Sequence, residues 1–183
     1  MLTFPGTSIE VSSLHEGASR ALFDGVFATG GITLSQVSIM TGLEPYQIQN
    51  WVKRGFLTSP IKRVYSREQF ARIVIINMLR DSIQIEKICS MLAAVCTDPK
   101  NPGSAWISND ALYHLYVDMI SDPRIRLTDP DEIISLTNEA SLRFSERSEG
   151  ERKTLSGILQ AMFFAHTASR LQTLSHEALF TIL

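Results

Sequence analysis

Cysteine is scarce in this sequence, with only Cys89 and Cys96 among 183 residues. Two cysteines cannot form the disulfide framework of a small secreted domain, and no histidine accompanies them at the spacing of a metal site. The sequence also lacks a basic and apolar leader at its start, and it has no uncharged apolar run of membrane-spanning length. We therefore expect a cytoplasmic protein that has no metal site and no membrane partner.

A large net charge of either sign is also missing. The formal net charge is −2 and the isoelectric point is about 6.1, so the whole molecule offers no argument for a polyanion partner. The charge is nevertheless uneven, because residues 32–96 contain eight Lys or Arg and four Asp or Glu, a net of +4, which leaves −6 for the rest. Only this basic segment is a candidate for contact with nucleic acid.

Arrangements typical of catalysis are absent as well. The four histidines have no carboxylate or cysteine partner at catalytic spacing. Gly30 and Gly31 lack the strand and helix context of a phosphate-binding loop. The acidic residues Asp129 and Glu132 fit the N-terminus of a helix better than a cation site. We predict no catalytic residue, no metal site and no cofactor, and hence a protein that is not an enzyme.

Helical periodicity is abundant, and we predict an all-α fold with one small wing. Residues 97–104 contain two prolines and a glycine and interrupt the periodicity on both sides, so they are predicted to form a linker. Before the linker, residues 1–31 would supply one N-terminal helix over 18–29, and residues 32–96 would form a separate domain. After it, residues 105–183 would form a helical dimerisation or sensing domain.

The segment after the linker predicts a series of helices. One begins near Ser108, and the next runs from Pro130 toward Glu146, with Asp129 as its N-cap. Residues 155–171 would form a largely buried helix, and Ser175 would cap a short final one. The aromatic residues of this segment are more typical of a core or a dimer interface than of a ligand pocket.

The basic segment contains two short helices separated by a glycine turn. Thr33 can cap the first helix, which Gly42 ends, and Pro45 opens a second helix that stops at Gly55. Two short helices joined in this way are typical of a helix-turn-helix, in which the second helix lies in the DNA major groove. The sequence therefore predicts a recognition helix over residues 45–54.

This second helix would carry a polar face and an apolar anchor. On a period of 3.6 residues, Ile48 and Trp51 point inward. The other positions present Tyr46, Gln47, Gln49, Asn50, Lys53 and Arg54. Amide side chains can bond bidentately to adenine, and cationic ones to guanine or phosphate. Such residues are also ordinary on the solvent face of an amphipathic helix, so composition alone leaves both interpretations open.

A wing and a core helix are predicted next along the chain. Residues 58–65 include Pro60, Lys62 and Arg63, which suits a short extended wing with cations at the level of the phosphates. Ser66 and Gln69 have the spacing of a capping box that starts an apolar core helix. A further amphipathic helix follows it.

These features occur in the stretches ITLSQVSIMTGLEPYQIQNWVKRGFL and KRVYSREQFARIVIINMLRDSIQIEKICSML. In this order they resemble the DNA-binding domain of MerR-type transcription regulators and, more closely, the bacterial family described as domain of unknown function 1836. The resemblance covers residues 32–95, about a third of the chain. It implies a bacterial winged helix-turn-helix regulator that binds double-stranded DNA as a homodimer, although it identifies no small-molecule effector.

The resemblance also implies roles for particular residues. Those that would face bases and backbone are Gln49, Asn50, Lys53 and Arg54, while Arg63 and Tyr65 would grip phosphate beside the wing. The wing is shorter than in MerR-type proteins, and neither their long dimerisation helix nor their cysteine metal loop is recognisable after Cys96. The alternative is a protein–protein adaptor that uses the same scaffold without binding DNA.

Overall fold

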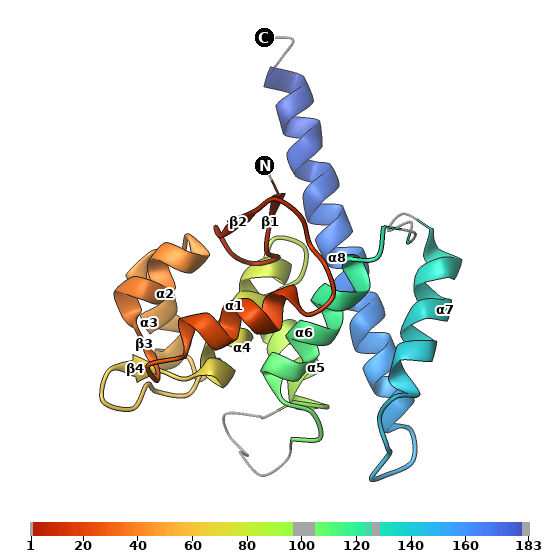
Figure 1. Cartoon of the computed structure of the whole chain (residues 1–183), viewed down its shortest axis with the longest axis horizontal. Helices are drawn as coiled ribbons and strands as arrows, with labels where there is room; N and C mark the ends of the chain where they lie inside the picture. The colour runs from red at the N-terminus through yellow and green to blue at the C-terminus, as the bar shows by residue number, and fades with distance from the viewer. Residues whose placement is uncertain (1, 97–104, 124, 126–128, 181–183) are drawn as a thin grey trace.

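The computed structural model describes residues 2–96, 105–123, 125 and 129–180. This part of the chain is mostly helical, which confirms the predicted all-α class (Figure 1). The predicted linker 97–104 lies outside the described residues. Among the helices that are described, none combines the length and the apolar character needed to cross a membrane.

The described chain contains eight helices and four strands of two residues each. The helices are α1 (Ala18–Val26), α2 (Leu34–Thr41), α3 (Pro45–Lys53), α4 (Arg67–Leu79), α5 (Ile85–Ala93), α6 (Asn109–Ile120), α7 (Pro130–Ser141) and α8 (Glu151–Phe180). The strands form two antiparallel pairs, β1 (Leu2–Thr3) with β2 (Glu10–Val11) and β3 (Ile32–Thr33) with β4 (Val64–Tyr65).

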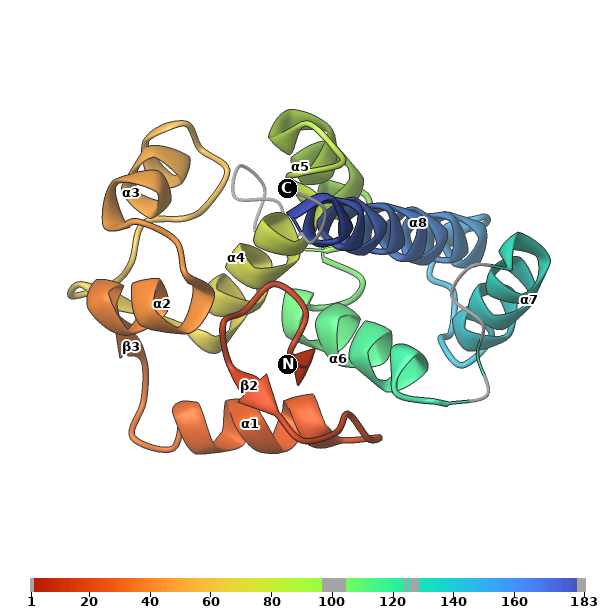
Figure 2. The ribbon, with the colours of Figure 1, turned by 90° about the horizontal axis from the view of Figure 1, so that it is seen from above.

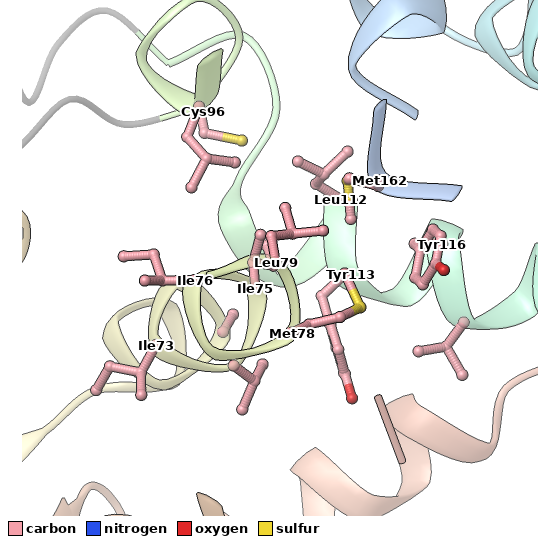
Figure 3. Close-up of a cluster of buried hydrophobic side chains, with 14 of the residues drawn as sticks. Ile73, Ile75, Ile76, Met78, Leu79, Cys96, Leu112, Tyr113, Tyr116 and Met162 are labelled. Atoms are coloured by element: carbon pink, nitrogen blue, oxygen red, sulfur yellow. The ribbon is translucent and has the colours of Figure 1, made fainter. Parts of the chain in front are cut away.

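Helix α4 is the centre of the core. Its N-terminus has the predicted capping box, in which the Ser66 hydroxyl accepts from the Gln69 backbone N–H and the Gln69 side chain accepts from the Ser66 N–H. Almost all its apolar side chains are buried, and they pack with side chains of α6 and α8 such as Tyr113 and Met162 (Figure 3). Figure 2 shows α4 between α2 on one side and α8 on the other.

Asn77 connects α4 to two other segments. Its amide nitrogen donates to the carbonyl oxygens of Gly6 and Thr41, each at 3.0 Å. The N-terminal segment and the end of α2 are therefore both held on α4. The N-terminal segment lies so close to α4 that a Cβ atom added at Gly6 would be 2.1 Å from the carbonyl oxygen of Val74.

A polar network joins α1, α4 and α6. The Nδ1 atom of His114 lies 2.8 Å from the Ser19 hydroxyl, and its Nε2 atom lies 3.1 Å from a guanidinium nitrogen of Arg67. Because a guanidinium can only donate, Nε2 accepts and the imidazole proton is on Nδ1, which donates to Ser19. Burial, and next the charge of Arg67, lower the pKa of His114 to about 4. The imidazole is therefore neutral at physiological pH.

Helix α7 begins as predicted but ends earlier. A side-chain oxygen of Asp129 accepts from the backbone N–H groups of Asp131 and Glu132, which confirms the predicted N-cap. The helix ends at Ser141 rather than near Glu146. The backbone carbonyl oxygens after the helix accept hydrogen bonds from side chains instead. Arg152 donates to the carbonyl oxygen of Phe144, and Trp106 donates to that of Ser145. The first helix, α1, also ends earlier than predicted, at Val26.

The predicted break before Ser175 is wrong. Helix α8 runs without interruption from Glu151 to Phe180, and Ser175 lies inside it. No proline or glycine occurs between Ile158 and Phe180, so nothing in this stretch forces the helix to stop. In the first half of α8 one side of the helix is buried in the core, whereas every residue from Leu171 to Phe180 is exposed.

Candidate nucleic-acid interface

Helices α2 and α3 are joined by a tight turn of the predicted kind. Gly42 ends α2 in the left-handed region, with φ of 69°, and its N–H donates to the carbonyl oxygen of Ser38. The Ser38 hydroxyl donates to the carbonyl oxygen of Leu43, and the Leu43 side chain is buried. The turn is therefore anchored both by hydrogen bonds and by an apolar side chain, which fixes α3 relative to α2.

Helix α3 has the predicted apolar anchor. Ile48 is fully buried and Trp51 is 4% exposed, so both predicted inward positions are confirmed. The side chains of Tyr46, Gln49, Asn50 and Lys53 are all exposed. At 100° per residue these four positions form one stripe that lies opposite the anchor. We call this set the exposed stripe.

Two other residues of the predicted recognition helix already have partners within the protein. One of them, Arg54, is the C-cap of α3, which ends at Lys53. Gln47 forms a capping box with Glu44, whose backbone N–H donates to the Gln47 side chain at 3.0 Å. Arg54 forms an ion pair with Glu86 of α5, and its guanidinium lies 4.6 Å from the ring centroid of Phe56. Neither belongs to the exposed stripe. Local sequence patterns miss the partner of Arg54, because Glu86 is 32 residues away.

The predicted wing is a short turn that leads into β4. Lys62 and Arg63 are exposed and have φ of 51° and 65°, and Ile61 forms a bridge with Val64. Two consecutive non-glycine residues in the left-handed region cost roughly 1 kcal/mol each. The turn thus holds two cationic side chains on the surface, as predicted, but with a twist that the sequence pattern does not indicate.

Tyr65 lies in a different environment from the one its predicted role requires. It sits in β4 opposite Ile32 and is only 3% exposed, and burial raises the pKa of its hydroxyl. Side chains alternate along a strand, so Val64 points outward where Tyr65 points into the core. A phosphate contact by Tyr65 does not fit this geometry, because its side chain is buried.

An apolar groove of about 340 Å³ lies beside the exposed stripe. It is lined by Leu34, Gln49, Val52, Pro60, Arg63 and Tyr65. The groove joins the side of α3 to the wing, so Gln49 and Arg63 border the same hollow. Sequence analysis missed it because its lining comes from three separate parts of the chain.

Residues 31–116 match the model of a family described as Domain of unknown function (DUF1836). This match supports the resemblance to that family which the sequence motifs indicate. It covers just under half of the chain and includes α2 through α5 and most of α6. No curated protein and no solved structure matches the chain significantly.

Proposed function

We propose that the protein is a sequence-specific DNA-binding transcription regulator that acts as a homodimer. In this proposal α2, the Gly42 turn and α3 form a winged helix-turn-helix like that of MerR-type regulators, and α3 lies in the major groove. The observation that carries the proposal is the exposed stripe on α3, which is directly opposite the Ile48 and Trp51 anchor. The anchor fixes the helix while its reading face stays free.

The chemistry of the stripe suits a DNA groove. Asn50 and Gln49 each offer the amide geometry that pairs with adenine, and Lys53 can donate to guanine or to phosphate. Lys62 and Arg63 would contact the phosphates beside the groove. Three cations in each subunit predict a slope of log affinity against log salt of about −3 per half-site. Binding should therefore be weak above physiological salt.

Selection from random duplex DNA tests this function. Purified full-length protein is incubated with the DNA pool at low and at physiological salt, and the retained fragments are sequenced. Enrichment of a two-fold symmetric motif at both salt concentrations supports a regulator with two recognition helices. Retention of DNA with no enriched motif would indicate nonspecific electrostatic binding to the DNA backbone and would contradict sequence-specific binding.

A variant pair identifies the reading surface. Asn50→Ala combined with Lys53→Glu should abolish retention of the selected motif while leaving the helical circular dichroism signal unchanged. Lys153→Glu is the matched control, because it makes the same charge change on an exposed lysine of α8. Equal loss in both variants would show that net charge, and not the face of α3, is responsible for the retention.

A protein–protein adaptor is the second candidate. It is favoured by three exposed apolar side chains around the same helices, since Ile39, Tyr46 and Ile61 are 76%, 67% and 78% exposed. Exposed apolar side chains become buried when they lie in a protein–protein contact. On this alternative the unmodified protein would retain no DNA even at low salt, so the selection experiment separates the two candidates.

A further inference from the structure

The C-terminal part of α8 has an exposed apolar face. Phe164, Leu171 and Leu174 are 42%, 53% and 55% exposed. In Figure 1 this part of α8 projects beyond the other helices toward the C-terminus. Single exposed leucines are ordinary on protein surfaces, but apolar residues aligned along one side of a helix are typical of an interaction surface.

The spacing of these residues is that of two packed helices. Phe164, Leu171 and Ala178 follow each other at intervals of seven, and Leu174 lies three residues after Leu171 and four before Ala178. This is the alternation of heptad positions a and d. We call these four residues the seam.

Another helix already covers the same side of α8 nearer its N-terminus. Ser156 and Gln160 of α8 each donate a hydrogen bond of 3.2 Å to the Thr137 hydroxyl of α7. Gln160 is four residues before Phe164, so the face that binds α7 continues directly into the seam. The hydrogen bonds to α7 reach this face of α8 at Ser156 and Gln160. Beyond them, the seam continues the same face as an exposed surface.

Two opposite charges indicate which partner fits the seam. Arg170 and Glu177 are both exposed, and each immediately precedes a seam residue at heptad position a, so both occupy position g. When two such helices run antiparallel, position g of one faces position g of the other. If Leu171 lies across from Leu174 of a second copy, Glu177 of that copy is two residues, or about 3 Å along the helix axis, from the level of Arg170. The two long side chains can meet across this offset, and the pair occurs twice.

A parallel arrangement lacks this complementarity. In a parallel pair in register, position g faces position e of the partner's next heptad, which for Arg170 is Ser175. The two Arg170 side chains would also lie at the same height. Charge therefore favours the antiparallel orientation and a second copy of the same chain.

We propose that the seam binds the seam of a second copy of this chain in antiparallel orientation. The helices would overlap from about residue 164 to the end of α8, a length of about 25 Å at 1.5 Å per residue. The remaining bodies of the two copies would lie at opposite ends of the overlap, around a two-fold axis near residues 172–173. Such an isologous contact closes with two copies and does not propagate.

This inference deepens the proposed function, because it assigns the contact surface of the homodimer on which that function rests. Its test uses the protein alone, so the two fail separately. A protein that dimerises through the seam but retains no DNA supports the proposed contact and contradicts the proposed function. A monomer that selects a DNA motif overturns the seam and the homodimer, but it leaves sequence-specific DNA binding by α3 intact.

Sedimentation equilibrium of the full chain at low and high micromolar concentration measures the association. We expect a concentration-dependent dimer, and Leu171→Glu with Leu174→Glu should raise its dissociation constant about tenfold or more. Gln172→Glu with Thr173→Glu is the matched control, since it places the same charges on other exposed faces of α8. A monomer at every concentration, or equal weakening by the control, overturns the proposal.

Charge exchange tests the orientation. Arg170→Glu alone and Glu177→Arg alone should each weaken the dimer, because each places like charges opposite one another twice. The double variant Arg170→Glu/Glu177→Arg restores both pairs and should return the dissociation constant to within about threefold of the original. Failure of the double variant to recover would overturn the antiparallel arrangement, even if the dimer itself persists.

Discussion

Arg54 at the end of α3 and Glu86 of α5 form an ion pair across the surface of the basic segment. Their side chains are 48% and 58% exposed, so the pair contributes about 0–1 kcal/mol to stability. Its importance is its position, because Arg54 is the basic residue at the C-terminal end of the proposed recognition helix. If α3 binds DNA as proposed, Glu86 would compete with DNA phosphate for the same guanidinium.

Glu86→Gln should strengthen DNA binding with little effect on folding. It releases Arg54 and removes one negative charge, so the slope of log affinity against log salt should steepen by about one. Filter binding of the selected motif at several salt concentrations measures this slope. Asp81→Asn is the control for charge alone, as Asp81 is 62% exposed and lies 4.0 Å from Arg80. Identical slopes for the two variants would contradict a specific release of Arg54.

Trp51→Ala should destabilise the fold much more than Tyr46→Ala, although both residues are large aromatics on α3. Trp51 is 4% exposed and its removal leaves a cavity, at a cost of about 3–5 kcal/mol in the free energy of unfolding. Tyr46 is 67% exposed, so its replacement by alanine should lower the free energy of unfolding by less than about 0.5 kcal/mol. Urea denaturation followed by circular dichroism compares them. Similar losses for both would mean that the packing of α3 differs from this structure.

Features set by a few neighbouring residues were predictable from the sequence. The N-caps Thr33, Ser66 and Asp129 all occur where the pattern indicates, because a capping side chain bonds to backbone groups two or three residues away. The inward direction of Ile48 and Trp51 follows from helical periodicity in the same way. These local rules were enough to locate α2, α3 and the turn between them.

Features that depend on distant partners were not predictable. The burial of Tyr65 results from pairing with Ile32, and the engagement of Arg54 results from Glu86, both more than 30 residues away. The continuation of α8 past Leu171 was missed for a different reason. The buried apolar pattern ends there, but a helix that has already formed can continue until a residue such as proline or glycine stops it.

The close contact between the N-terminal segment and α4 predicts that replacement by alanine destabilises the protein much more at Gly6 than at Gly42. Gly6 and Gly42 have φ of 72° and 69°, so alanine is strained by about 1 kcal/mol at either position. At Gly6 the added Cβ would also meet Val74 backbone at 2.1 Å, whereas at Gly42 it would meet nothing within 4 Å. Gly6→Ala should therefore lose about 1–3 kcal/mol more than Gly42→Ala. Urea denaturation measures both, and equal losses would show that the segment does not pack against α4.

The neutral His114 predicts that the protein loses stability as the pH falls. Its pKa is lowered from 6.5 to about 4 in the folded state, first by burial and then by Arg67. Between these two values the unfolded chain binds a proton that the folded chain excludes, so the free energy of unfolding decreases as the pH falls from about 6.5 to about 4. For one group the loss totals about 3 kcal/mol. His166, whose pKa burial also lowers to about 4, adds a decrease of the same sign.

Replacement of one histidine isolates its share of this pH dependence. In His114→Gln, the amide can bond Ser19 and Arg67 but does not titrate, so the decrease between about pH 6.5 and pH 4.5 should shrink to the part that His166 and the carboxylates supply. Exposed His176 is the control, and His176→Gln should leave the decrease unchanged. Urea denaturation across this range provides the comparison. If His114→Gln keeps the full decrease, His114 takes up its proton at the same pH in the folded and the unfolded state, and the hydrogen bond from Arg67 to its Nε2 atom does not keep the imidazole neutral.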